Sequence, residues 1–378
     1  MNAASHFDPQ TPEEITRPAR PIRFAQPRPR LARLPIELAL ISAFLAVMVI
    51  GCAVCSFSLV LIGPERVLAL RDQLLGDTPQ KRQEAIAQVV QMVVRGDESV
   101  WPAPNRGRLT VLLMGVDRRP QEGEAPTRSD AITLVAVDPI SRTAAMLSIP
   151  RDLYVPLAQI GLVDRINTAY VYGEVRNLPG GGAQLARDTL TLNLGVPIQK
   201  HFIINFEGFK KAIDALGGID IDVPNVIVDE AYPTDDYRTE RLVIPAGRIH
   251  MDGELALKYV RTRHQDSDFG RLQRQQQMIL AVRDKALSLD MLAQLPQLID
   301  AAHGFYQTDL SLAEMVSLAR VWSEIPRERI AVYRIDESMV QYWTTPGGGS
   351  VLIPLREVIA PIVDAFLYGP LDASAVAP

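Results

Sequence analysis

The chain has 378 residues, which is enough for two or three domains or for one large domain with appended segments. Its hydrophobic share of 47% and charged share of 22% are ordinary, so a wholly disordered or fibrous protein is excluded. Only 2 Cys and 5 His are present, which excludes a disulfide-dense scaffold and disfavours a polyhistidine metal site. A net charge of −5 excludes a protein that coats nucleic acid through bulk positive charge.

The N-terminal part of the chain is predicted to form three segments that attach it to a membrane. Residues 1–35 are rich in Pro and Arg and indicate a disordered cytoplasmic tail. Residues 36–63 contain 25 consecutive uncharged residues and predict a transmembrane signal anchor, since about 20 apolar residues cross a bilayer as a helix. The arginines before this run predict a single-pass membrane protein whose C-terminal part is extracytoplasmic. Residues 64–107 are predicted as a stalk or linker. The alternative is a cleaved signal peptide with an unusually long leader.

The part beyond residue 62 is acidic and free of cysteine. It carries 33 basic and 40 acidic residues, because the first 62 residues hold 6 and 4. No bulk attraction to nucleic acid is therefore expected, and any anion site must be a local cluster. Arg outnumbers Lys by 33 to 6 in the whole chain. Either genomic base composition or a need for planar phosphate ligands would explain this excess.

The main domain is predicted over residues 108–378 and alternates strands with helices. The near-continuous apolar run 109–115 indicates a strand that is buried on both faces. Residues 225–249 are predicted to be irregular. Strands interleaved with helices favour an α/β fold whose sheet is covered on both sides. The other predicted elements are strands at 131–137, 143–149, 201–206, 219–223 and 329–335, and helices at 183–194, 207–216, 252–261, 272–289, 311–323 and 354–367.

Charged side chains follow or precede the first three predicted strands. Asp117 comes directly after the first strand and Asp130 directly before the second, and two carboxylates at strand ends suit Mg²⁺. The ordinary alternative is that both residues cap turns. Pro150 ends the third strand, so Arg151 and Asp152 are expected at the same edge, unless they form a surface turn.

A second charged cluster lies around the start of a predicted helix. Four arginines fall within fourteen residues, at positions 261, 263, 271 and 274. Guanidinium groups and free backbone N–H groups at a helix N-terminus together favour an anion. Asp268 could orient an arginine or accept a proton. The alternative is a solvated, charged helix face.

Several segments occur in a fixed order: LLMGVD, RSDAITLVAVDP, MLSIPRDLYV, DRINTAYVYG, FEGFKKAIDALGGIDIDV and LKYVRTRHQDSDFGRLQRQQ. In this order they resemble the LytR-CpsA-Psr family of bacterial cell-envelope proteins. The resemblance extends over residues 108–289. It implies an α-β-α sandwich with a central mixed sheet and an apolar lipid-binding cleft, preceded by one N-terminal transmembrane helix.

The resemblance also implies an activity. Such a protein transfers a glycopolymer from a polyprenyl-pyrophosphate donor to a cell-wall acceptor, commonly peptidoglycan, and releases polyprenyl phosphate. The expected partners are the lipid-linked donor, a cell-wall glycan and the membrane, without nucleic acid. A non-catalytic polyprenyl-phosphate carrier and a pyrophosphate hydrolase remain alternatives. A transcriptional regulator is disfavoured by the negative charge and the expected export.

The resemblance assigns expected roles to individual residues. Asp117 and Asp130 match the ligands of Mg²⁺, with Mn²⁺ as the alternative ion. The expected catalytic residues are Arg151, Arg263, Asp268 and Arg271. The expected pyrophosphate-binding residues are Arg128, Arg151, Arg165, Arg261, Arg263, Arg271 and Gln275. Arg165 stands where many relatives have Lys, so the positive charge at this position is kept.

Overall fold

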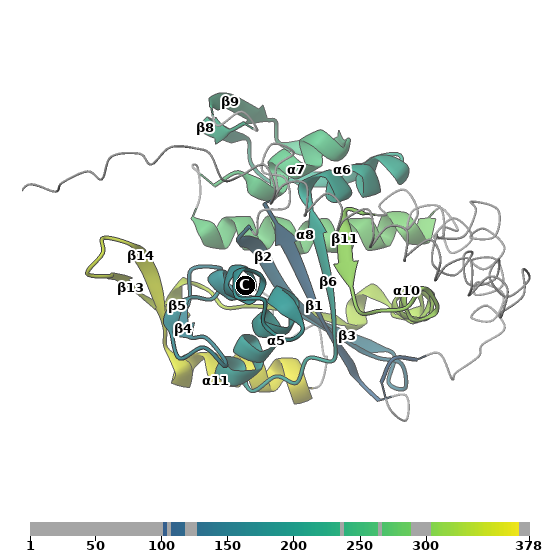
Figure 1. Ribbon diagram of the computed structural model, residues 1–378. Coiled ribbons are helices and arrows are strands. Elements are labelled where there is room, and N and C mark those ends of the chain that lie inside the picture. Colours follow the sequence, from purple (N-terminus) through teal and green to yellow (C-terminus); the bar gives the residue numbers. More distant parts are fainter. Residues whose placement is uncertain are drawn as a thin grey trace, which may run out of the picture. The chain divides into compact units, whose positions relative to one another are not determined.

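The computed structural model describes residues 101–103, 107–117, 127–234, 238–263, 267–288 and 304–369 (Figure 1). The predicted cytoplasmic tail, the predicted membrane span and most of the predicted stalk lie outside these ranges. None of the helices within the described ranges combines the length and the hydropathy that a bilayer crossing requires. The anchor therefore stays a prediction.

A mixed six-stranded sheet forms the centre of the fold, as the sequence predicts. The neighbouring strands β1 and β2 are antiparallel, as are β2 and β3, whereas β6 is parallel to β1 and β12 is parallel to β3. The short edge strand β11 is antiparallel to β6. In the order β11–β6–β1–β2–β3–β12, the strands are Tyr306–Thr308, Lys200–Asn205, Leu109–Val116, Ser129–Asp138, Thr143–Ser148 and Ile330–Arg334.

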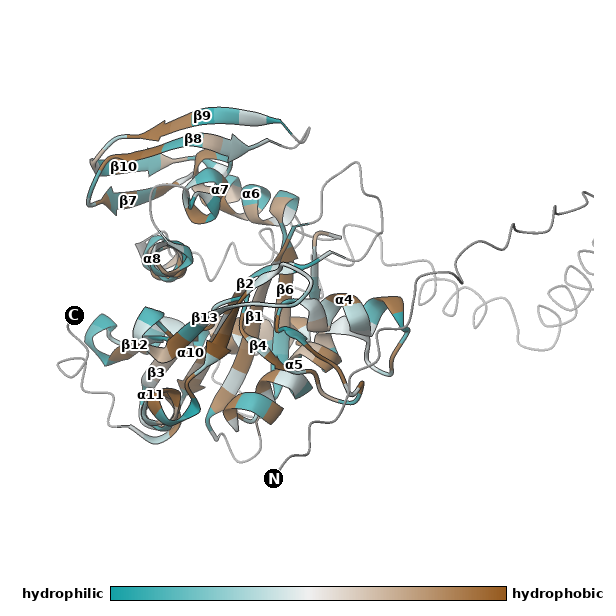
Figure 2. Cartoon of the chain, turned by 90° about the vertical axis from the view of Figure 1, so that its left-hand side faces the viewer, coloured by the Kyte–Doolittle hydropathy of each residue, from teal (hydrophilic) through white to brown (hydrophobic). Residues whose placement is uncertain are grey.

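Helices cover both faces of this sheet (Figures 1 and 2). Alternate residues of β1 enter different cores: Leu112 and Met114 pack on one side, and Leu109 and Val111 on the other. Because side chains alternate along a strand, a continuous apolar run is what two buried faces require. The first face carries the helices α4, α5 and α11, which are Thr168–Val175, Gly181–Leu194 and Arg356–Tyr368. The second face carries α8 and α10, which are Asp268–Ser288 and Leu312–Glu324.

A third core lies among elements that follow β6 in the chain. Helix α6 begins at Phe206, after Asn205 accepts a capping hydrogen bond from the Gly208 amide at 2.8 Å. The apolar residues of this core also come from two small sheets, and Met278 joins them from α8. The elements are α6 (Phe206–Ala215), α7 (Gly253–Arg261), the pair β7 (Ile219–Val223) and β10 (Gly247–Met251), and the pair β8 (Ile227–Pro233) and β9 (Thr239–Ile244).

The prediction that residues 225–249 are irregular is wrong, because this stretch contains β8, β9 and the start of β10. The strands are half-buried, but not all of their outward residues are polar, which masks the alternation in the sequence. In β9, Leu242 and Ile244 are buried while Arg241 and Val243 face solvent. This alternation is the signal of a strand with one solvated face. Helix α8 also begins at Asp268, four residues before its predicted start at 272, since its first turn contains two charged residues and a glycine.

Short elements on the first face were not predicted from the sequence. They are α4 and the strands β4 (Tyr154–Pro156), β5 (Val163–Arg165), β13 (Val340–Thr344) and β14 (Ser350–Pro354). Strands of three residues are too short for a periodic signal, and β13 is exposed at four of its five positions. Helices α4 and α5 pack closely through glycine, since a Cβ on Gly182 would lie 2.3 Å from the Tyr170 carbonyl oxygen.

Helix α11 is expected to be held to the sheet by Phe366, whose side chain is 0% exposed. Phe366→Ala should lower the free energy of unfolding by about 3–5 kcal/mol, because it removes buried apolar area and leaves a cavity. Tyr368→Ala on the same helix is the control, since Tyr368 is 80% exposed and its loss should change stability by no more than about 0.5 kcal/mol. Chemical denaturation of both variants measures the difference, and equal stabilities would contradict this role of Phe366.

Candidate active site

Three strand ends meet at one edge of the central sheet. Asp117 follows β1 and Asp130 lies at the start of β2, and these strands are antiparallel, so the two carboxylates reach the same edge. The Asp117 amide donates to the Arg128 carbonyl oxygen at 3.3 Å. Because β3 is antiparallel to β2, Arg151 emerges there as well. The sequence-based expectation that these residues share an edge is therefore confirmed in the geometry.

Arg151 lies at the centre of a cluster of carboxylates. Its guanidinium forms an ion pair and a hydrogen bond with Asp130. Its Nε lies 3.5 Å from Asp152 Oδ2 and 4.0 Å from Asp268 Oδ2. The side chain is 16% exposed, so three carboxylates offset the desolvation of one arginine. This cluster joins β2, the segment after β3 and the first turn of α8.

Asp268 connects the same cluster to two further arginines. Its Oδ1 lies 3.8 Å from Arg263 Nη1 and 3.7 Å from Arg271 Nη1. The side chain of Arg271 is only 4% exposed, whereas that of Arg263 is 46% exposed. Because Asp268 occupies the first turn of α8, the helix dipole also favours its negative charge. Asp268 thus holds three of the predicted site arginines around one carboxylate.

The electrostatic environment shifts the pKa values of the two neighbouring carboxyl groups, Asp152 and Asp268, in opposite directions. Burial is the largest influence on Asp152 and raises its pKa; Arg151 and Arg165 act to lower it, Asp268 acts to raise it, and the net shift is upward. Burial also acts to raise the pKa of Asp268, but Arg271, Arg151 and Arg263 outweigh it, so its pKa is lowered. A proton on this pair is therefore favoured on Asp152.

The arginines also respond to burial. Burial lowers the pKa of Arg271, and the like charge of Arg151 lowers it further. For Arg151, burial acts in the same direction, but the carboxylates Asp130, Asp152 and Asp268 reverse it and raise the pKa. Within the described residues, the Nε of Arg271 and the Oε1 of Gln275 are buried without a hydrogen-bond partner. These atoms can bind a ligand without breaking a bond in the protein.

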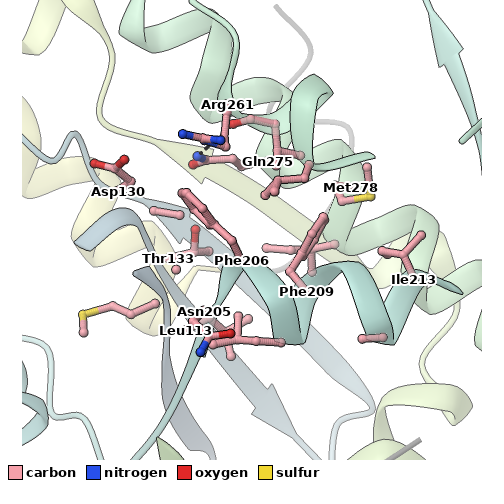
Figure 3. A pocket seen from close by; sticks show the side chains of 18 of the residues that line it. Leu113, Asp130, Thr133, Asn205, Phe206, Phe209, Ile213, Arg261, Gln275 and Met278 are labelled. Atoms are coloured by element: carbon pink, nitrogen blue, oxygen red, sulfur yellow. Dashed lines mark hydrogen bonds between the residues drawn. The ribbon is translucent and has the colours of Figure 1, made fainter. Parts of the chain in front are cut away.

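An apolar cavity of about 860 Å³ extends from this cluster between the sheet and helices α6, α7 and α8. Figure 3 shows Phe206 and Phe209 projecting into it from α6, with Arg261 and Gln275 nearby. The Arg261 guanidinium carbon lies 4.2 Å from the centroid of the Phe206 ring, a cation–π contact. The sequence alone did not identify these two aromatic residues as part of a site. The signal available was the amphipathic helix α6, part of whose apolar face lines a cavity.

A polar cavity of about 800 Å³ adjoins the apolar one. Four residues line both cavities, so the cavities adjoin there; these residues are Asp117, Asp130, Arg151 and Arg263. The predicted residues divide between them. Arg261, Arg271 and Gln275 line only the apolar cavity, and Arg128, Arg165 and Asp268 line only the polar one.

Two arginines of the motif regions have contacts that hold the fold together. Arg165 lies 3.3 Å from Asp152 Oδ1 and donates to the Ser350 carbonyl oxygen at 2.8 Å, so it ties β14 to the carboxylate cluster. Arg274 is buried and donates to the carbonyl oxygen of Tyr259 at 2.9 Å and to that of Thr262. Arg274 lines neither cavity and instead joins α7 to α8.

The acidic residues at the sheet edge could hold a metal ion only if a bound ligand supplied further oxygen atoms. No group of three or more His, Cys, Asp or Glu that could hold a metal occurs within the described residues. Asp117 and Asp130 supply two carboxylates, and Asp130 Oδ1 is bonded to Arg151. Mg²⁺ commonly uses one or two carboxylates and completes its shell with phosphate oxygens and water. The donor set therefore fits Mg²⁺ that is shared with a bound phosphate.

An apolar cavity that opens onto buried arginines and carboxylates is suited to an amphiphile with an anionic head group. The LytR_cpsA_psr family model matches residues 76–351, and the chain belongs to this family. The family resemblance deduced from the motifs is thereby confirmed.

Individual relatives agree with this assignment. TagV of Bacillus subtilis (strain 168), named polyisoprenyl-teichoic acid–peptidoglycan teichoic acid transferase, is 34% identical over 233 residues, which span 61% of this chain and 56% of TagV. The crystal structure of B. subtilis TagV matches with a TM-score of 0.56 and 29% identity, over 70% of this chain and 100% of that chain. A structure described as TagT bound to LI-WTA matches with a TM-score of 0.55 and 26% identity, over 70% and 92% of the two chains.

The raised pKa of Asp152 predicts a pH-dependent effect on stability. A carboxyl group whose pKa is raised in the folded state favours folding while protonated, and this stability is lost as the pH rises through that pKa. Asp152→Asn stays neutral, and its amide can still donate to Asp268. Its thermal midpoint at pH 7 should therefore exceed that of the wild type, and the difference should shrink as the pH falls towards 3.8, the usual carboxyl value. Thermal unfolding across this range measures it, and a lower midpoint at pH 7 would contradict the shift.

Proposed function

We propose that the protein transfers a glycopolymer from a polyprenyl-pyrophosphate donor to a cell-wall acceptor, peptidoglycan, and releases polyprenyl phosphate. The observation that carries this proposal is that a large apolar cavity and a polar cavity adjoin at a cluster of arginines and carboxylates. The names of the relatives support it, since TagV is named as a transferase of teichoic acid to peptidoglycan.

The apolar cavity would hold the prenyl chain of the donor. Its walls come mainly from the sheet and from helices α6, α7 and α8, with contributions from β8 and α10, and its aromatic side chains include Phe206 and Phe209. Burial of each CH₂ group contributes about 0.8 kcal/mol, so several isoprene units give substantial affinity. The pyrophosphate would then lie where the two cavities meet.

Arginine side chains would neutralise the pyrophosphate. Arg151 and Arg263 line both cavities, and the buried Nε of Arg271 has no hydrogen-bond partner among the described residues. Guanidinium groups bind phosphate oxygens through charge-assisted hydrogen bonds. Held in place beforehand, they also stabilise the charge that develops on the leaving phosphate.

The proposed reaction is an in-line displacement at phosphorus. The acceptor hydroxyl oxygen forms a bond to the sugar-proximal phosphorus, and the bond from this phosphorus to the bridging oxygen breaks. The bridging oxygen leaves as part of polyprenyl phosphate. Asp268 and Asp152 face the polar cavity, and this carboxyl pair would accept the hydroxyl proton.

Asp117 and Asp130 are the residues that would hold Mg²⁺ or Mn²⁺, which when bound supplies positive charge to the phosphate oxygens. The proposed location of the domain is the outer side of the membrane, tethered by the anchor expected at residues 36–63. Tethering would keep the protein and a lipid-linked donor on one surface at high effective concentration.

Removal of Arg263 tests the proposed function directly. Arg263→Ala should lower transfer from a lipid-pyrophosphate donor at least 100-fold, about 2.7 kcal/mol of transition-state stabilisation. Circular dichroism should show an intact fold, because this side chain is 46% exposed and its ion pair with Asp268 is long, at 3.8 Å. Arg241→Ala is the control, since Arg241 is exposed, pairs with Glu230 and lines neither cavity. Mass spectrometry of the lipid product measures turnover.

Normal turnover by Arg263→Ala would overturn the assignment, and release of lipid phosphate without acceptor modification would identify a hydrolase.

A divalent cation is expected to be required. Treatment with EDTA should abolish transfer, and added Mg²⁺ should restore it, because two carboxylates alone increase rather than offset the negative charge of a pyrophosphate. The comparison is made on one protein preparation with thermal unfolding as a check of the fold. Full activity after EDTA would remove the metal role of Asp117 and Asp130.

A further inference from the structure

Asn167 is a buried polar residue whose hydrogen-bonding capacity the protein does not fully use. It is 3% exposed and lines the polar cavity. It occupies the N-cap position of α4, but its side chain forms no capping hydrogen bond. Its Oδ1 is buried without a hydrogen-bond partner among the described residues. A group left in this state costs about 1–3 kcal/mol, so its position indicates a ligand.

The unpaired oxygen of this amide needs a hydrogen-bond donor, which phosphate does not supply. Oδ1 can only accept a hydrogen bond, and phosphate oxygens at neutral pH also mainly accept. The Oγ1 of Thr127 lies in the same cavity and is likewise buried without a partner within the described ranges. A ligand with O–H or N–H groups satisfies both residues, and sugar hydroxyls are such groups.

An aromatic ring adds an apolar surface to this cavity. Tyr342 on β13 lines the polar cavity and is 55% exposed. Its hydroxyl donates to Glu337 Oε1 at 3.1 Å, which restricts the ring while leaving its face open. An exposed, restrained aromatic ring beside polar groups suits a pyranose, whose C–H face is apolar and whose edge carries hydroxyls.

The cavity is rigidly connected to the carboxylate cluster. Arg165 contacts Asp152 and the Ser350 carbonyl oxygen, and the Leu352 amide donates to the Asp152 carbonyl oxygen at 3.0 Å. The β13–β14 hairpin is therefore bonded to the segment that carries Asp152. A sugar against Tyr342 would have its hydroxyls near Asp152 and Asp268.

The direction of the displacement decides which sugar occupies this place. The leaving group is lipid phosphate, and its chain extends into the apolar cavity. The attacking and leaving oxygens lie roughly in line across the phosphorus. The attacking hydroxyl must therefore approach from the polar cavity, on the far side of the four residues that line both cavities.

We propose that Asn167 and Tyr342 form a subsite for a sugar ring of the acceptor glycan in the polar cavity. Asn167 binds a hydroxyl or acetamido group, and the Tyr342 ring packs against the pyranose. This inference rests on the proposed function for its choice of acceptor over donor. The existence of a sugar site rests on the cavity itself.

Binding of soluble, uncrosslinked peptidoglycan strands to the purified full chain tests the subsite. Calorimetry should show that Asn167→Ala and Tyr342→Ala each weaken binding at least 10-fold. Tyr342→Phe should bind within about threefold of the wild type, because the ring remains. Tyr368→Ala is the matched control, an exposed aromatic that lines neither cavity. Asn167→Ala should not lower the thermal midpoint, since the side chain forms no capping hydrogen bond and its Oδ1 has no partner within the described protein.

A second measurement separates this inference from the proposed function. Affinity for a polyprenyl pyrophosphate without sugar, and for the complete glycan-bearing donor, is measured with the same variants. Both affinities should stay within about threefold of the wild type. Weaker binding of the glycan-bearing donor alone would assign the subsite to the donor and overturn the proposal, as would unchanged or absent binding of the strands. Failure of the wild type to bind either lipid, with strand binding lost in the variants, would overturn the proposed function and leave a sugar site.

Discussion

The pairing of Arg151 with three carboxylates is the constraint on which the site depends. A buried guanidinium is tolerated only when opposite charges offset its desolvation, and Asp130, Asp152 and Asp268 come from three separate segments to do so. The pairing fixes the edge of the sheet against α8 and thereby brings Arg263 and Arg271 to the same place. Loss of the shared arginine would leave these carboxylates without their common cation, and breaking a buried pair in this way typically costs about 3–5 kcal/mol, so the fold and the site depend on the same contacts.

The structure has one apolar and one polar cavity because the helices and strands bury different faces. The sheet and the first-face helices share a large apolar core, whereas α6, α7 and α8 approach the sheet without filling the space lined by Phe206 and Phe209. The strand ends border this space with charged groups. One chain thus places an apolar environment next to an anion-binding environment, which suits a lipid with an anionic head group.

Elements that are buried on both faces could be predicted from the sequence, because a short continuous apolar run between turn residues is typical of a fully buried strand. β1, β2 and β3 were located within a few residues for this reason. Half-buried strands such as β8 and β9 were missed, since the exposed, apolar Val243 and the buried, polar Asp229 disturb their alternation, and three-residue strands such as β4 are too short for a periodic pattern. The early start of α8 was missed because the sequence around Asp268 has the polar and glycine-containing composition of a solvated turn.

The sequence by itself determined the residue types of the site and their order along the chain. The motif positions at the strand ends were sufficient to predict that Asp117, Asp130 and Arg151 meet. Only the tertiary structure decided which arginines of the motif regions face a cavity and that Arg274 instead joins two helices. It alone showed that Asn167 is buried with an unused acceptor and that Tyr342 lines the same cavity. Burial and hydrogen bonding depend on segments that are distant in the chain, and spacing along the sequence contains no record of that packing.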